Sequence, residues 1–126
     1  MNAETQIAQE LSKLGFAPET LEISGLGGNR AVAFKYRVRV GRCKGNHFRV
    51  GVAFQESGYP EYPPHFVWVA ELTNARLPVH STCHHQGVRW EAFSVPPSDF
   101  WDRLPPSEKN MKTYINRHLA RFWNQV

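Results

Sequence analysis

The chain has few cysteines and no long apolar run. Only two of its 126 residues are cysteines, Cys43 and Cys83, too few for the disulfide framework of a small secreted domain. Near the start, the apolar residues are interrupted by Gln, Glu and Lys, unlike the apolar core of a signal peptide. No segment approaches the roughly 20 apolar residues that a membrane span needs. These absences predict free thiols, a cytoplasmic location and no membrane partner.

The sequence also lacks a block of like charge. Fifteen basic and eleven acidic residues give a net charge of +4, spread along the chain. Nucleic-acid-binding modules usually concentrate positive charge on one face, so a nucleic-acid partner is not expected. The tightest basic run lies on one predicted strand and its turn, and it is either a solvated strand face or a docking surface for an acidic protein. It consists of Lys35, Arg37, Arg39, Arg42 and Lys44.

The length and the apolar fraction of 41% predict one folded domain over residues 1–126. Its first element is a helix at about residues 3–14. Ile7, Leu11 and Leu14 form one apolar stripe at helical spacing, and Asn2 is a suitable N-cap.

Three strands are expected next, over residues 31–40, 47–55 and 65–70, because apolar side chains alternate in the first two and fill the third. Residues 41–46 read as a hairpin turn. Consecutive strands of this kind predict an antiparallel meander. No regular pattern follows over residues 71–104, which predicts a long loop, and such loops are usually functional.

A final helix is predicted from about Ser107. Met111, Ile115, Leu119 and Phe122 are spaced by four, four and three residues, as on the buried face of a helix. The order of helix, strands, long loop and helix indicates an α+β fold.

A proline-rich motif separates the second and third predicted strands. It reads Tyr-Pro-Glu-Tyr-Pro-Pro over Tyr59–Pro64. Prolines cannot donate ladder hydrogen bonds, so the strand must end here and the chain must turn rigidly. The rings of Tyr59 and Tyr62 are expected to be partly buried against the sheet.

This motif and its spacing resemble those of ubiquitin-conjugating enzymes. That family carries Tyr-Pro-x-x-Pro-Pro between two strands, a carrier cysteine about twenty residues later and then a tryptophan. Here Cys83 follows Pro64 by nineteen residues, and Trp90 follows Cys83 by seven. The family's His-Pro-Asn tripeptide is reduced to Asn74, His84 replaces a leucine, and two C-terminal helices are absent. The chain is therefore more similar to divergent prokaryotic relatives, which occur in ubiquitin-like conjugation and antiviral operons.

The resemblance implies a UBC-like fold in which residues 71–104 are the active-site loop. It also implies a transferase that carries a ubiquitin-like modifier as a thioester on Cys83 and transfers it to an amine. The partners would be the modifier, an activating enzyme and a protein substrate, with no cofactor or metal. His80, His84 and His85 surround the cysteine as candidate bases, and Asn74 could take the family asparagine's role.

Two alternatives remain open. The first is a catalytically inactive binding module of the same fold. The second is a small metal-dependent hydrolase, in which His80, Cys83 and His85 are ligands and Glu91 is the base. Trp90 is expected to be core packing, and Cys43 a surface thiol.

Overall fold

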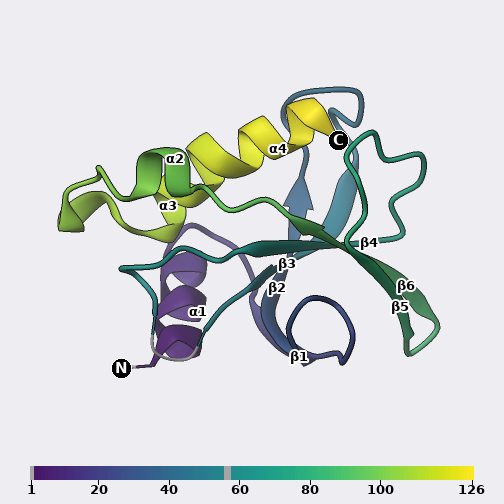
Figure 1. The fold of residues 1–126 in the computed structure, drawn as a ribbon, viewed down its shortest axis with the longest axis horizontal. Coiled ribbons are helices and arrows are strands. Elements are labelled where there is room, and N and C mark those ends of the chain that lie inside the picture. Colours follow the sequence, from purple (N-terminus) through teal and green to yellow (C-terminus); the bar gives the residue numbers. More distant parts are fainter. Residues whose placement is uncertain (1, 56–57) are drawn as a thin grey trace.

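Six antiparallel strands form one curled sheet in the order β1-β2-β3-β4-β6-β5, with the helices on one of its faces (Figure 1). This computed structural model describes residues 2–55 and 58–126. The strands are β1 (Glu19–Glu22), β2 (Arg30–Arg37), β3 (His47–Ala53), β4 (Phe66–Ala70), β5 (Ser81–His85) and β6 (Val88–Ser94). The helical elements are α1 (Ala3–Lys13), α2 (Ser98–Trp101), the short 3₁₀ helix η1 (Pro106–Glu108), α3 (Met111–Thr113), the π-helical stretch η2 (Tyr114–Leu119) and α4 (Ala120–Gln125). The α+β fold class is confirmed. No described helix is both long and apolar enough to cross a bilayer.

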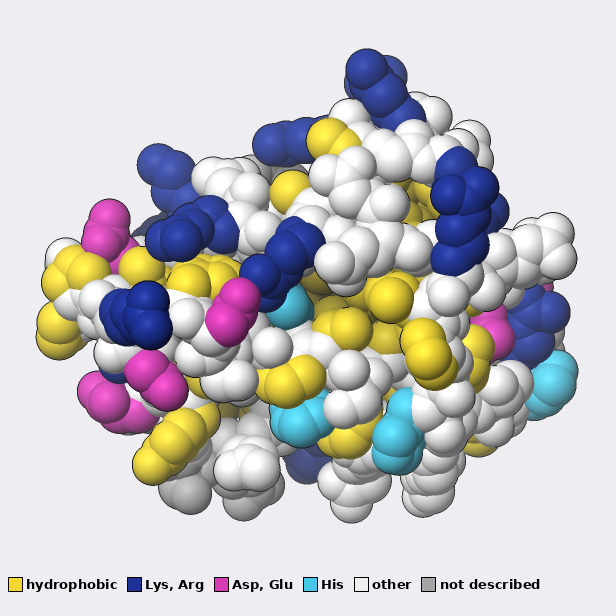
Figure 2. Space-filling model, turned by 45° about the horizontal axis from the view of Figure 1, so that its top comes forward, with side chains coloured by type: hydrophobic (Ala, Val, Ile, Leu, Met, Phe, Trp, Pro, Cys, Tyr) yellow, Lys and Arg dark blue, Asp and Glu magenta, His cyan; other side chains and the backbone are white. Residues whose placement is uncertain are grey.

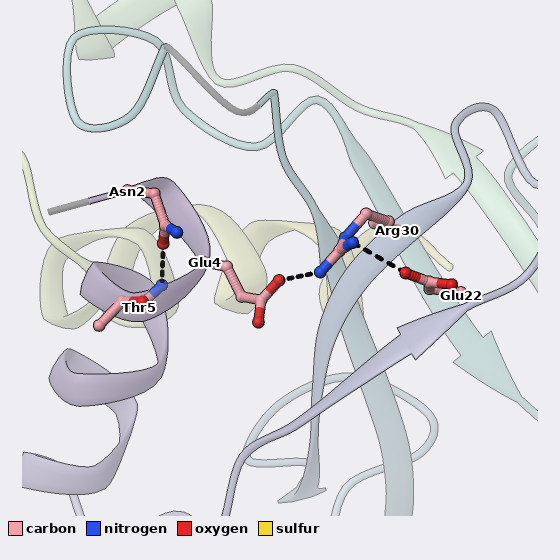
Figure 3. Close-up of polar contacts among 5 residues, drawn as sticks. All are labelled: Asn2, Glu4, Thr5, Glu22 and Arg30. Carbon is pink, nitrogen blue, oxygen red and sulfur yellow. Dashed lines mark hydrogen bonds and ion pairs between the residues drawn. The ribbon is translucent and has the colours of Figure 1, made fainter.

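Helix α1 begins where the sequence predicts. The Asn2 side chain accepts a hydrogen bond from the Thr5 amide at 2.8 Å, which satisfies one free N–H of the first turn. In the same region, Arg30 at the start of β2 pairs with Glu4 of α1 and with Glu22 of β1, the latter at 2.8 Å (Figure 3). Arg30 therefore connects the first turn of α1 to two neighbouring strands.

The main core lies between the sheet and the helices. Ile7 and Leu11 of α1 are fully buried there, as the apolar stripe predicts. Leu14, the third residue of the predicted stripe, is instead the C-cap of α1 and is 37% exposed. The C-terminal helical run contributes its predicted face in the same way, by burying Met111, Ile115, Leu119 and Phe122. The stripes of two helices distant in sequence thus cover one face of the sheet.

A second, smaller core covers part of the opposite face, and it contains only strand and loop residues. Trp68 of β4 and Trp90 of β6 meet edge to face at 6.5 Å between ring centroids. The Trp68 indole also donates to the Leu26 carbonyl at 2.9 Å, which fixes the β1–β2 loop over this face. Gly51 makes room for Trp68, because a Cβ there would lie only 3.3 Å from the Trp68 Cβ. Trp90 is 1% exposed, which confirms its prediction as core packing.

The prediction of a long loop over residues 71–104 is wrong. That region contains the hairpin of β5 and β6 and the short helix α2. The strand β1 was also missed. Both β1 and β5 are edge strands with polar sequences and little burial, so neither shows strong apolar alternation. The connection from β4 to β5 passes over β6, so the simple meander holds only from β1 to β4.

The Tyr59–Pro64 segment between β3 and β4 is hydrogen-bonded to the helices, and Tyr59 belongs to the main core between the helices and the sheet. Tyr59 is buried, but Tyr62 is 68% exposed, so the prediction that both rings are packed is wrong for Tyr62. The Trp101 indole of α2 donates to the Pro60 carbonyl at 2.9 Å, and the Tyr114 hydroxyl of η2 donates to Pro64 at 3.3 Å. Proline residues that cannot donate hydrogen bonds serve here as acceptors.

One carboxylate joins three segments at this position. Glu10 of α1 accepts a hydrogen bond from the Tyr59 hydroxyl at 2.5 Å and another from the Met111 backbone amide at 2.8 Å. Burial, the hydrogen bond to Glu10 and the charge of that carboxylate raise the pKa of Tyr59, so it stays a protonated donor. The contact fixes α1, the connector and the start of α3 relative to one another.

Replacing Glu10 with alanine is therefore expected to destabilise the fold by about 1–3 kcal/mol, because two buried donors lose their acceptor. Urea unfolding at neutral pH measures this. Glu10→Gln keeps one amide oxygen as an acceptor and should lose less stability. Gln9→Ala, an exposed change on the same helix, is the matched control. Equal losses for Glu10→Ala and Gln9→Ala would contradict this role.

A buried histidine lies in the π-helical stretch. His118 is 3% exposed, and its Nε2 donates to the Val95 carbonyl, while its Nδ1 faces the Arg121 guanidinium at 3.4 Å. Burial is the main cause that lowers the pKa of His118 from 6.5 to about 4, and nearby Arg121 acts in the same direction. The Val95 carbonyl and the Asp99 carboxylate partly oppose this shift. His118 is thus neutral at pH 7, with both ring nitrogens satisfied.

This shift predicts an acid-dependent stability. Between about pH 6.5 and pH 4 the unfolded chain binds a proton at His118 that the folded chain does not, so stability falls as the pH falls through this window. The loss from this group approaches about 3 kcal/mol near its lower end. Urea unfolding at pH 7 and pH 4.5 tests it. His118→Gln, which can still donate to Val95, should show a smaller difference between the two pH values. An unchanged difference would show that other groups cause the acid sensitivity.

Candidate functional site

The β5–β6 hairpin places Cys83 at the edge of the sheet. Cys83 is directly opposite Trp90, and the two strands are joined by the two-residue turn of Gln86 and Gly87. Both turn residues have positive φ, 52° and 77°, as in the hairpin turns that match strand twist. Since β5 has a neighbour on one side only, Cys83 lies on the last strand of the sheet.

The Cys83 thiol is half-buried. Its side chain packs against the second core, to which the opposite residue Trp90 belongs. Its Sγ lies 3.6 Å from the carbonyl oxygen of His84, which is the only hydrogen-bond partner of this thiol among the described residues. The thiol is therefore reachable from solvent and is supported on one side by apolar packing.

The three histidines lie close to Cys83 in the sequence but do not converge on its thiol. Because side chains alternate along a strand, His85 shares the face of Cys83, and His84 points to the other face. His80 precedes the strand, with its Nδ1 3.3 Å from the Ser81 hydroxyl and its ring against Phe66 at 4.9 Å. The structure brings all three imidazoles to one hairpin, but none forms a hydrogen bond with the thiol.

Asn74 is not brought to the cysteine. It lies in the β4–β5 connection with a positive φ of 56°, and its carbonyl accepts from Arg42 at 2.8 Å. Leu72 and Leu77 of the same connection pack into the main core, on the helix-bearing face of the sheet. Cys83 packs on the opposite face. Asn74 therefore functions in this structure as a turn residue that helps to fix the loop.

The three-ligand metal site is not assembled either. In residues 2–55 and 58–126, no group of three or more His, Cys, Asp or Glu side chains could hold a metal ion. Glu91 is opposite Thr82 on the hairpin, one position away from Cys83 and thus on the other face. The proposed base and the proposed cysteine ligand therefore point away from each other.

Cys43 differs from its prediction as a surface thiol. It is only 4% exposed and belongs to the main core, although it lies in the β2–β3 turn. The turn folds back against the C-terminal helix, where Arg42 donates to the main-chain oxygens of Thr73 and Val126 at 3.0 and 3.2 Å. Both cysteines are free in this structure.

Sequence reasoning missed two residues that fix neighbouring segments, Arg42 at the β4–β5 connection and Glu10 at the connector between β3 and β4. Arg42 was visible only as part of a basic run, and its hydrogen bonds to main-chain oxygens could not be read from that pattern. The turn at Gln86 and Gly87 carried one sequence signal, because a glycine at the second position is typical of two-residue hairpin turns.

Comparison with known proteins adds no relative. No protein-family model matches the chain, and neither a curated protein nor a solved structure is similar to it. The functional argument therefore depends on the residues themselves.

The two thiols should differ sharply in reactivity. Iodoacetamide is expected to alkylate Cys83 in the native protein at least about tenfold faster than Cys43, because only Cys83 is open to solvent. Peptide mass spectrometry at several times gives both rates from one sample. In denaturant the two rates should converge. Faster native labelling of Cys43 would contradict this description of the hairpin.

Proposed function

We propose that this protein carries a ubiquitin-like modifier as a thioester on Cys83 and transfers it to an amine of a protein substrate. The observation that supports this most directly is the position of the thiol. Cys83 is half-buried on an edge strand and follows the Tyr-Pro motif at the spacing of a carrier cysteine. A carrier thiol must be reached by two large partners in turn, and the open edge of a sheet permits this approach.

The chemistry consists of two exchanges at one carbonyl carbon. First, the Cys83 thiolate attacks the thioester that joins the modifier to the activating enzyme. A new C–S bond forms, the old one breaks, and the departing thiolate takes up the proton that Cys83 gave away. Next, a substrate amine attacks the Cys83 thioester, a C–N bond forms, and the amine's proton returns to Cys83 as its C–S bond breaks.

This reaction does not need a strongly activated cysteine. The leaving group and the nucleophile in the first exchange are both thiols, so accessibility contributes more than a base bonded to Sγ. The second exchange needs an acceptor for the amine's proton. His85 is the best placed of the three histidines, since it shares the face of Cys83 two residues along β5.

A catalytically inactive binding module is the second candidate. The observation that favours it is the absence of a hydrogen bond from any imidazole, or from Asn74, to the Cys83 thiol in the described structure. A module of this kind would use its surface and would not need the thiol. The two candidates therefore make opposite predictions for substitution of Cys83.

The loading reaction distinguishes them. The purified protein is incubated with ATP and with an activating enzyme and ubiquitin-like protein encoded beside its gene, and its intact mass is measured. The wild type should gain the mass of the modifier minus one water, and reducing agent or hydroxylamine should remove it. Cys83→Ser should form an ester that resists reducing agent, because oxygen is a poorer leaving group than sulfur. Cys83→Ala should gain no mass.

Cys43→Ala is the matched control, and it should load like the wild type. Urea unfolding of each variant separates loss of loading from loss of folding. A folded wild-type protein that gains no mass would refute the carrier proposal and leave the binding module. Normal loading of a folded Cys83→Ala protein would refute Cys83 as the carrier residue.

A further inference from the structure

A hollow of about 590 Å³ lies near the C-terminal end of β2. It is bounded by the segment that follows α1, the end of β2 and the β2–β3 turn. Its volume is within the range of small-ligand sites and matches a few amino-acid residues. Its lining consists of Phe16, Tyr36, Arg37, Val38, Arg39, Lys44 and Gly45.

The rim of this hollow is positively charged. Arg37, Arg39 and Lys44 are all exposed, and no acidic residue lines the hollow. Within the described residues none of these three cations forms an ion pair, whereas Arg49, Lys109 and Arg121 each pair with a carboxylate. Three cations around one hollow repel one another unless an anion lies between them.

The floor of the hollow is apolar and ordered. The Phe16 ring packs against Phe34 at 4.9 Å between centroids, and the Tyr36 ring stacks on Trp123 at 6.4 Å. Tyr36 is only 2% exposed. Burial raises the pKa of Tyr36, and the positive charge of Arg39 partly opposes this rise, which is consistent with a positive potential at the floor.

The β2–β3 turn that forms one wall is held in place. Val38 receives a hydrogen bond from the Gly45 amide at 2.8 Å and donates to Asn46 at 2.9 Å. Gly41 has a φ of 82° and lies so close to Trp123 that a Cβ would be 2.2 Å from the Trp123 carbonyl oxygen. The turn therefore lies beside the C-terminal end of α4, as Figure 1 shows, and the hollow exists before any ligand binds.

We infer that this hollow binds an acidic segment of a partner protein, with one apolar side chain on the aromatic floor and carboxylates at Arg37, Arg39 and Lys44. Guanidinium groups suit carboxylates because their planar donors can form two parallel hydrogen bonds. The three unpaired cations are complementary in charge to the carboxylates of such a segment. The apolar floor is complementary to one apolar side chain of the same segment.

A protein segment fits these observations better than a nucleic acid. Single-stranded nucleic acids need several exposed rings on which successive bases stack, whereas Phe16 is the one partly exposed ring that lines this hollow and Tyr36 is buried. A nucleic-acid backbone also needs a continuous basic track. On the face seen in Figure 2, Lys and Arg side chains are separated by apolar, acidic and other side chains. The inference does not depend on Cys83 or on the proposed function.

Fluorescence anisotropy with a synthetic probe tests the site. The probe is a fluorescein-labelled peptide in which one phenylalanine is flanked by glutamates on both sides. It should bind the wild type, and affinity should fall as salt rises. The double variant Arg37→Glu/Arg39→Glu should bind about tenfold more weakly or worse. A matched control, Arg103→Glu/Lys112→Glu, makes the same charge change at exposed positions outside the hollow and should bind almost as well as the wild type.

A second peptide and a second variant test the apolar floor and the basic rim separately. A peptide with alanine in place of phenylalanine should bind more weakly, since it leaves the floor empty. Lys44→Glu replaces the double variant if urea unfolding shows that the latter is not folded. The inference would be overturned if the probe did not bind, or if the variant and its control lost the same affinity for the probe. It would also be overturned if single-stranded DNA bound more tightly than the probe and lost as much affinity in the double variant.

Discussion

The carboxylate of Glu10 is the contact on which the arrangement of the helices depends. It accepts hydrogen bonds from the Tyr59 hydroxyl and the Met111 amide, so it joins the first helix, the proline-rich connector and the C-terminal helical run. The Trp101 indole and the Tyr114 hydroxyl then donate to connector carbonyls. The Tyr-Pro motif therefore acts as a hub for helices that are distant in sequence.

The parts of the fold that the sequence predicted are those with strong periodicity. The stripe of Ile7 and Leu11 and the alternation in β2 and β3 identify their elements correctly, because burial of one face imposes the period. Strands β1 and β5 were missed for the opposite reason. As edge strands they bury few side chains. Their mostly polar sequences therefore show no alternation of apolar and polar residues that would distinguish them from a loop. The predicted exposure of Cys43 and the predicted burial of Tyr62 were wrong. The burial of each side chain depends on how its turn folds back against the rest of the protein, and the local sequence pattern contains no information on this.

The candidate site was predictable in its center but not in its surroundings. Cys83 and its three histidines do lie together on one hairpin, since they are adjacent in sequence. Asn74 lies on the other side of the sheet from the thiol, because the β4–β5 connection packs its apolar residues into the main core. No one-dimensional spacing could reveal on which face that connection runs. The hollow at the β2–β3 turn likewise required the fold, since Phe16 and Lys44 meet there only in three dimensions.

Strands β4 and β5 differ in how many amino-acid substitutions they can tolerate. Strand β4 is buried on both faces, with Val67 and Val69 in the main core and Trp68 and Ala70 in the second. Nearly every substitution in β4 would therefore disturb one core or the other. Strand β5 has one neighbour and only half-buried or exposed side chains. Over evolutionary time the strand that carries Cys83 can diverge, and acquire or lose chemistry, while the strands that support it remain nearly constant.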